Sequence, residues 1–330
     1  MVCGACAAGQ PTDGKAGLRL VFKEVYVPRG TPVRSISPYR RREMWTAYLF
    51  ILPALLLYLV LVFWPVVQSI GIGFFEWSGL EKEMKFVGLD NYVTMFTRDP
   101  VFIQSLGNSI VATLVLALVP TALGLGFAAL FSNLRGGGFY RSAIFLPYLV
   151  SMVAVGTIWS WMYNPRIDAP GILLNAVGLG GLVHDWLGER ATAMAAALVP
   201  GIWRFTGFAI VIFYAAIQTI PVDLYEAARV DGASGWQSFR KITVPLVRQA
   251  MIVVVVWMTM DALKLFDLIF VLTRGNPNHA TEVIATWMFA NTFRHYKMGY
   301  GAAMSVVLFL MILGFSIIYI RWTTRGEEEA

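Results

Sequence analysis

One polar segment, YEAARVDGASGWQSFRKITVP at residues 225–245, lies between two long apolar stretches of the chain. It carries five charged side chains: Glu226, Arg229, Asp231, Arg240 and Lys241. No nucleophile and base stand in an arrangement typical of covalent catalysis anywhere in the sequence. The segment is therefore expected to bind a partner. The sequence does not indicate a membrane enzyme.

Two short helices joined by a turn are predicted within and just before this segment. Each begins with a capping-box pattern, in which a side-chain acceptor at the N-cap is followed three residues later by Glu or Gln. The two patterns are Asp223 with Glu226 and Ser234 with Gln237. Gly232 supplies a helix stop between them. Pro245 is expected to end the second helix, because the residue before a proline disfavours the α region.

The predicted helices present small and aromatic side chains. Ala227 and Ala228 would let another backbone approach closely, and Trp236 and Phe239 lie on one face of the second helix. Exposed aromatic side chains are costly unless they pack on something. Two interpretations stay open: the rings fold back onto the protein's own spans, or they form a docking surface for a cytoplasmic partner.

Four ionisable side chains lie within apolar stretches. Arg204 lies near the middle of one stretch, and Asp261, Lys264 and Asp267 follow one another in a second at a spacing that shares a broad helix face. A charge at membrane depth costs roughly 3 kcal/mol, so these side chains should face protein or water. They either line the route of a polyhydroxylated solute or form ion pairs, Lys264 with one of the aspartates.

Three uncharged polar side chains also lie within or at the edge of apolar stretches: Asn108, Tyr214 and Gln218. Hydrogen bonding between helices is the expected role of each.

Sites for metals, phosphates and nucleic acids are not indicated. The histidines at 184, 279 and 295 lack metal-ligand spacing, and Cys3 and Cys6 lack the second pair that a zinc site needs. The glycine-rich RGGGF lacks the lysine of a phosphate-binding loop. The positive charges flank apolar spans and form no basic face with interleaved aromatics. We expect no cofactor bound by this chain and no nucleic-acid partner.

Membrane-spanning helices are the elements expected to position these residues. The 330 residues are 57% hydrophobic and 14% charged, with a mean hydropathy of +0.63, whereas soluble domains have about 25% charged residues. Six stretches reach the roughly 20 apolar residues that cross a bilayer as a helix. They are residues 47–72, 106–132, 140–163, 192–219, 248–273 and 301–321.

The distribution of Lys and Arg predicts that both termini face the cytoplasm, because cytoplasmic segments are enriched in these residues. In this orientation the inner segments hold 16 of them and the outer loops hold 8. The excess comes from the N-terminal tail, where Arg40, Arg41 and Arg42 lie beside the first span. Residues 225–245 then face the cytoplasm.

The spacing E-A-A, three residues, G, nine residues, I-x-L-P resembles the signature loop of ABC importer permeases. The matching residues are Glu226, Ala227, Ala228, Gly232, Ile242 and Pro245, with Val244 where leucine is usual. The segments FVGLDNY, RSAIFLPYLVS, IWRFTGF, IPVDLYEAARVDGA and FDLIFVLT are similar to the carbohydrate-uptake group, first-permease type, as in maltose and glycerol-phosphate permeases. GNPNHAT departs from the usual glycine-glycine-proline run of this group.

The resemblance implies an all-α, six-span type I ABC importer permease fold with N-in/C-in topology, in a bacterial inner membrane. The chain would be a subunit of an ATP-driven, binding-protein-dependent sugar importer. Its partners, besides membrane lipid, would be a second homologous permease, two ATP-binding subunits and an extracytoplasmic sugar-binding protein. ATP and Mg would bind to the ATPase subunits, so this chain by itself would not be an enzyme.

The resemblance also implies roles for residues. Glu226 would contact the ATPase, and the helix after Gly232 would act as the lever. The expected coupling residues are Glu226, Ala227, Ala228, Asp231, Gly232, Trp236, Phe239, Ile242 and Pro245. The capping pattern gives Glu226 a second expected role, as the N3 cap of its own helix.

Four parts of the chain are expected. They are a flexible basic cytoplasmic tail (1–45), the first span with its outer loop (46–103), a five-helix core (104–322) that contains the coupling hairpin 222–246, and a cytoplasmic C-terminal tail (323–330). The alternative function is an ion-gradient-driven secondary transporter of small polar solutes. It would predict inverted repeats and interrupted helices, and no convincing internal repeat is present in the sequence.

Overall fold

The structure, a computed structural model, describes residues 38–132 and 137–328. The chain divides into two compact units, Met1–Val60 and Leu61–Ala330, and each is treated by itself. Cys3, Cys6 and most of the predicted N-terminal tail lie outside the described residues. The tail boundary at residue 45 stays a prediction, and helix α1 already begins before it, at Pro38. Proline suits a first helical turn, where its missing N–H would have no partner.

The first span is helical from Thr46 to Ile72. Its 27 residues have a mean hydropathy of 2.6, and its apolar window has no buried side chains within the chain. Helix α1 (Pro38–Tyr58) is followed by a π turn (Leu59–Phe63) and α2 (Trp64–Ile72). A helix of this length and hydropathy is suited to cross the hydrocarbon core of a bilayer.

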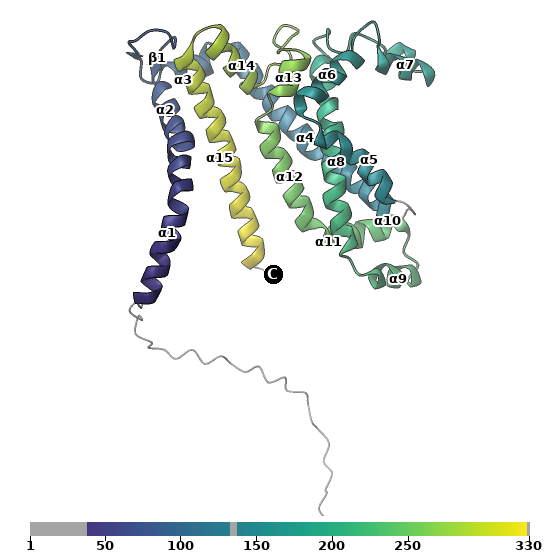
Figure 1. Cartoon of the computed structure of the whole chain (residues 1–330). Coiled ribbons are helices and arrows are strands. Elements are labelled where there is room, and N and C mark those ends of the chain that lie inside the picture. Colours follow the sequence, from purple (N-terminus) through teal and green to yellow (C-terminus); the bar gives the residue numbers. More distant parts are fainter. Residues whose placement is uncertain (1–37, 133–136, 329–330) are drawn as a thin grey trace, which may run out of the picture. The chain divides into compact units, whose positions relative to one another are not determined.

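The second unit contains the remaining helices (Figure 1). They are α3 (Asp90–Thr97), α4 (Pro100–Ser132), α5 (Gly137–Leu149), α6 (Met152–Met162), α7 (Ala169–Ala176), α8 (Ala193–Gln218), α9 (Val222–Val230), α10 (Gly235–Ser238), α11 (Val244–Leu246), α12 (Arg248–Leu263), α13 (Asp267–Leu272), α14 (Ile284–Phe289) and α15 (Met298–Glu328). Strands β1 (Phe75–Glu76) and β2 (Lys85–Phe86) form a small antiparallel ribbon. Apart from this ribbon, the regular secondary structure of the described residues is helical, so the all-α prediction is confirmed.

Two of the six predicted spans are not continuous helices. The third, predicted as 140–163, bends by 111° between Leu149 and Met152. The fifth, predicted as 248–273, is bent by 70° from the preceding helix and ends at Leu263. Hydropathy reports composition and not direction, so a stretch that turns still scores as one span. Ser151 marks the first bend, because its hydroxyl accepts a hydrogen bond from the backbone of Ala154 and begins a new helix.

Helices α4, α8 and α12 build the main core of the second unit. Buried side chains of this core include Leu116, Phe205, Phe213 and Met258. Small residues let the backbones of α4 and α8 approach closely, as is common between membrane helices. A Cβ at Gly124 would overlap the Cβ of Ala209.

We expect Gly124→Ala to destabilise the protein by about 1–3 kcal/mol, because the extra methyl group has no room between α4 and α8. Gly126→Ala is the matched control two residues along the same helix, since a Cβ there meets no atom within 4 Å. The measurement is the thermal unfolding midpoint of the solubilised protein. Equal midpoints for the two variants would contradict this packing.

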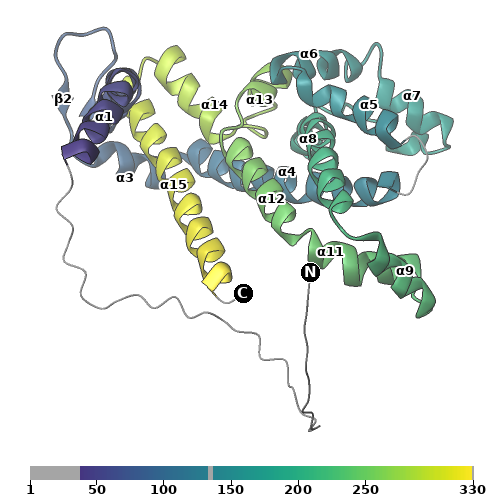
Figure 2. The ribbon, with the colours of Figure 1, turned by 60° about the horizontal axis from the view of Figure 1, so that its bottom comes forward.

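Helices α9, α10 and α11 gather at one end of the second unit, and α13 and α14 lie at the other end (Figures 1 and 2). Helix α12 connects the two ends, since α11 leads into it across a bend and α13 follows it. The fold therefore places the polar segment of the sequence and the loops around residue 280 at opposite ends of the same helices.

Candidate functional site

Helix α9 begins two residues earlier than the capping pattern predicts. Its N-cap is Pro221, whose side chain has no polar atom, and its first residue is Val222. Asp223 therefore lies at N2, beside the positive end of the helix dipole. The predicted capping box of Asp223 with Glu226 is wrong, and so is the cap role of Glu226. Pro221 has no backbone N–H for a glutamate to accept from.

The turn after α9 is the predicted glycine stop. Gly232 has φ +78°, a left-handed conformation that side chains with a Cβ disfavour. The backbone N–H of Ala233 donates to the carbonyl of Ala228 at 2.8 Å, and that of Gly232 donates to Arg229 at 3.0 Å. This pair of bonds is a Schellman motif, which satisfies the last carbonyls of α9. The helix stop at Gly232 is confirmed.

The second capping box is also confirmed. The backbone N–H of Gln237 donates to Ser234 Oγ at 3.3 Å, and the backbone N–H of Ser234 donates to Gln237 Oε1 at 2.7 Å. The prediction that Pro245 ends this helix is wrong. A π turn, Phe239–Thr243, continues α10 into α11, and Pro245 lies inside α11. The wider turn accommodates a residue that cannot donate a backbone hydrogen bond.

The two aromatic side chains of the second helix divide between the two interpretations that the sequence leaves open. Phe239 is half-buried and packs against the main core. Trp236 stacks on Phe239 with ring centroids 5.4 Å apart, but 69% of its surface remains exposed. Phe239 therefore anchors the hairpin to the spans, and Trp236 presents an indole face at the surface.

A tyrosine that the sequence analysis did not single out fixes the first helix to the second. Tyr225 packs on the core, and its hydroxyl lies 2.9 Å from Thr243 Oγ1, which is buried. A cavity of about 400 Å³ lies beneath the hairpin, between α9, α10 and the ends of α4 and α8. The two residues are 18 positions apart and lie on different helices, so no local pattern could have paired them.

We expect Tyr225→Phe to destabilise the protein by about 1 kcal/mol, because Thr243 would lose its buried hydrogen-bond partner. The thermal unfolding midpoint measures this loss. Tyr296→Phe is the matched control, since among the described residues its exposed side chain has no hydrogen-bond partner. A shift as large in the control would show that the effect does not come from the hydrogen bond.

Most of the predicted coupling residues lie on the surface of the hairpin. Glu226, Ala227, Asp231 and Pro245 are exposed, whereas Ala228 and Ile242 are half-buried. Within the described part of the chain, the carboxylate of Glu226 has no ion pair or hydrogen bond. The hairpin thus presents a free carboxylate, small residues and an indole ring together.

The charges predicted within spans do not form the ion pairs considered for them. Within the described residues, Lys264 has no ion pair with either aspartate, and the three side chains are exposed. Helix α12 ends at Leu263, so Lys264 caps it and Asp267 starts α13. The shared helix face predicted for Asp261, Lys264 and Asp267 is wrong.

Arg204 supports the bend between α5 and α6. Its Nε donates to the carbonyl of Val150 at 3.3 Å, and its guanidinium lies 4.7 Å from the centroid of the Tyr148 ring. Val150 lies between the two helices, so its carbonyl is outside the backbone hydrogen bonding of either helix. The bond from Arg204 gives this carbonyl a donor.

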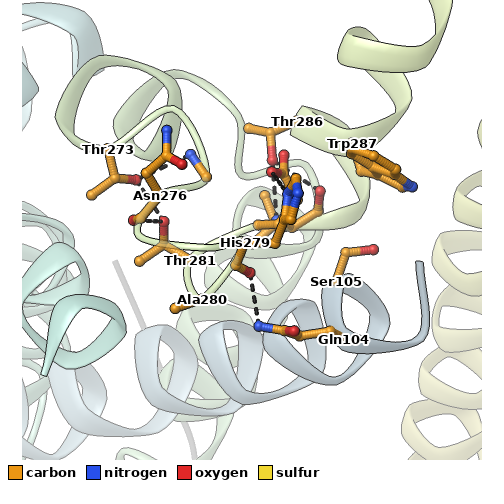
Figure 3. Close-up of polar contacts among 12 residues, drawn as sticks. Gln104, Ser105, Thr273, Asn276, His279, Ala280, Thr281, Thr286 and Trp287 are labelled. Atoms are coloured by element: carbon orange, nitrogen blue, oxygen red, sulfur yellow. Dashed lines mark hydrogen bonds and ion pairs between the residues drawn. The ribbon is translucent and has the colours of Figure 1, made fainter. Parts of the chain in front are cut away.

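The loop around residue 280 is held by hydrogen bonds to α4 (Figure 3). Gln104 donates to the carbonyl of His279, and Asn108 donates to the carbonyls of Ala280 and Glu282, at 2.8–2.9 Å. Asn108 forms hydrogen bonds to this loop and not to a second helix, so the interhelical role predicted for it is wrong. This loop contains GNPNHAT, and four of its residues have positive φ: Arg274, Gly275, Asn278 and His279.

The family model of the binding-protein-dependent transport system inner membrane component matches residues 120–325. This range includes the whole hairpin and both bent spans. The chain belongs to this family. It is therefore a membrane permease, a non-catalytic subunit of an ABC importer that works with a periplasmic binding protein and a separate ATPase. Its place is the inner membrane, which it crosses several times.

Characterised relatives extend the match over most of the permease. It is 37% identical over 284 residues to the osmoprotective compounds uptake permease protein of Synechocystis, covering 85% of this chain and 99% of that protein. It is 34% identical over 286 residues to the trehalose/maltose transport system permease protein of Thermococcus litoralis, covering 86% and 96%.

A solved structure shows the same fold. The crystal structure of a bacterial alginate ABC transporter, in complex with an alginate pentasaccharide-bound periplasmic protein, has a chain that matches with a TM-score of 0.74 and 21% identity. The match covers 88% of the permease and 98% of that chain. The predicted type I ABC importer permease fold is confirmed.

Proposed function

We propose that the permease forms half of the translocation pathway of a sugar importer, and that the hairpin 222–246 transmits the movements of the ATPase to the spans. The observation that carries the coupling role is the construction of the hairpin. Its inner side is fixed to the core by Tyr225 and Phe239, whereas its outer side presents Glu226 and Trp236. A rigid element that is anchored on one side and free on the other can pass a force applied at its surface to the helices behind it.

Sugar is proposed as the substrate class because relatives carry such names. One is the trehalose/maltose permease, and others are permeases for diacetylchitobiose in Streptomyces coelicolor and for sulfoquinovosyl glycerol in Agrobacterium fabrum. The further partners proposed are a second homologous permease and two ATP-binding subunits, which hold ATP and Mg. No cofactor is proposed for this chain.

The charged side chains near the spans are proposed to line the path of the solute or to face the second permease. Asp261, Lys264 and Asp267 are exposed in the isolated chain and have no ion pair within its described part. Charges that face lipid are costly, so these side chains need water or a polar partner. Arg204 is proposed to border the same path from the bend that it supports.

Reconstitution in proteoliposomes tests the proposal. The permease, its partner permease, the ATPase and the binding protein should together take up a disaccharide such as trehalose when ATP is supplied on the ATPase side. Omission of the binding protein or of ATP should abolish the uptake. Uptake that follows an ion gradient without the ATPase would instead support the secondary transporter, which the family match does not favour.

A further inference from the structure

A pocket of about 270 Å³ lies at the end of the second unit opposite the hairpin, which the predicted orientation places outside the membrane. It is formed by α13, the loop around residue 280, α14 and the π turn Ala290–Arg294. The lining residues that matter here are Arg274, His279, Glu282, Trp287, Arg294 and His295. Charged and aromatic side chains thus meet in one concave site.

Two guanidinium groups border this pocket without a carboxylate partner. Within the residues that the structure describes, neither Arg274 nor Arg294 has an ion pair or a side-chain hydrogen bond. Arg294 lies with its guanidinium carbon 5.6 Å from the centroid of the Phe270 ring. An arginine carries five N–H donors in a planar fork that matches a carboxylate or phosphate. The two side chains therefore supply unused donors suited to an anion.

The single acidic residue of the pocket does not cancel this charge. Glu282 has a side chain that is only 6% exposed, and its Oε2 lies 3.2 Å from Nδ1 of His279. The carboxylate of Glu282 is therefore buried in the pocket wall and contacts His279, whereas the side chains of the two arginines are exposed. His295, the remaining titratable group, lies edge-on to Trp287.

The pocket is held in shape before any ligand binds. Gln104 and Asn108 fix one side of the loop to α4, and Thr273 and Thr281 join its two arms with hydroxyl oxygens 2.7 Å apart (Figure 3). Trp287 is fixed by a 2.9 Å hydrogen bond from Nε1 to Asp99. A site that needs little rearrangement loses less free energy on binding.

We propose that this pocket is a binding subsite for a small carbohydrate that carries a carboxylate or phosphate group. The arginines would take the anionic group, the ring of Trp287 would contact the apolar face of the sugar, and the side-chain amide of Asn276 would bond to hydroxyl groups. The volume is suited to a single sugar ring. The carbohydrate part of this assignment rests on the proposed function, whereas the anion part rests on the arginines alone.

The test is a titration of the assembled transporter in lipid nanodiscs, without the binding protein, followed by saturation-transfer difference NMR. Glucuronate and glucose 6-phosphate are the probes, and glucose and inorganic phosphate are the comparisons. We expect both acidic sugars to bind about tenfold or more tightly than glucose, since hydrogen bonds to charged groups are the strong ones. Arg274→Gln and Arg294→Gln should each lower the affinity by a similar factor.

Arg166→Gln is the matched control, because Arg166 is an exposed arginine of another loop at the same end and does not line the pocket. It should leave the affinity unchanged. Equal binding of glucose and glucuronate, or unchanged affinity in the two pocket variants, would overturn the proposal. Phosphate that binds as tightly as glucose 6-phosphate would overturn its carbohydrate part.

Two further outcomes are informative. One distinguishes sugar binding from docking of the binding protein, and the other distinguishes the subsite from the proposed import function. Pocket variants that weaken docking of the binding protein but keep glucuronate binding would overturn the subsite and assign the arginines to protein docking. Glucuronate binding that depends on both arginines, in a transporter that shows no ATP-driven uptake of sugars, would support the subsite and contradict the proposed function.

Discussion

Gly232→Pro should abolish substrate-stimulated ATPase activity while the permease still inserts into the membrane. Proline fixes φ near −65°, whereas Gly232 has φ +78°. The substitution also removes the N–H that donates to Arg229 at 3.0 Å. The hairpin would have to adopt another turn, at a cost of about 3 kcal/mol or more. This free energy corresponds to a decrease of roughly a hundredfold or more in the population of the native hairpin conformation. ATP hydrolysis by the reconstituted transporter, with and without loaded binding protein, measures the coupling.

Gly235→Ala is the matched control for this experiment. Gly235 lies in the same hairpin, but it has no positive φ and a Cβ there meets no atom within 4 Å. The control should keep normal coupling. Gly232→Ala should give an intermediate result, since a Cβ in the left-handed region costs about 1–2 kcal/mol. Normal coupling in Gly232→Pro would show that the turn is not part of the coupling element.

Trp236→Ala should weaken the association of the permease with its ATPase by roughly thirtyfold. Trp236 exposes 69% of its surface on the same hairpin as Glu226, and buried tryptophans at interfaces commonly contribute about 2 kcal/mol or more. Its removal should leave the unfolding midpoint nearly unchanged, because the ring packs mainly on Phe239. The affinity of the purified ATPase for the permease in nanodiscs is the quantity to measure.

Trp161→Ala provides the comparison, since Trp161 is 66% exposed but lies on α6 rather than on the hairpin. It should leave the association with the ATPase unchanged. Phe239→Ala should behave differently from both, because Phe239 packs on the core and its loss should lower the unfolding midpoint. Equal ATPase affinities for wild type and Trp236→Ala would remove Trp236 from the interface.

The turn chemistry of the hairpin could be predicted from the sequence because it is local. Gly232 and the pair of Ser234 and Gln237 act through bonds that span at most five residues along the chain. The first capping box failed for an equally local reason. Pro221 occupies the N-cap, so the helix begins before Asp223 rather than at it.

The bends and anchors could not be predicted, because contacts between distant segments create them. Neither glycine nor proline marks the end of α12 at Lys264, and the next residue, Leu265, is buried in the main core. Arg204 satisfies the carbonyl of Val150 from another helix. A hydropathy window detects neither the burial of Leu265 nor the hydrogen bond of Arg204. The sequence therefore predicts straight spans, and a row of charged residues within one of them, in places where the structure has turns.

The hairpin is proposed to contact the ATPase directly. A photo-crosslinking amino acid at position 227, where Ala227 is exposed, tests this in the assembled transporter, and position 182, where Leu182 is exposed at the opposite end of the unit, is the control. We expect a covalent product with the ATPase subunit from position 227 and none from position 182. A probe at 227 that labels only lipid or another subunit would contradict it.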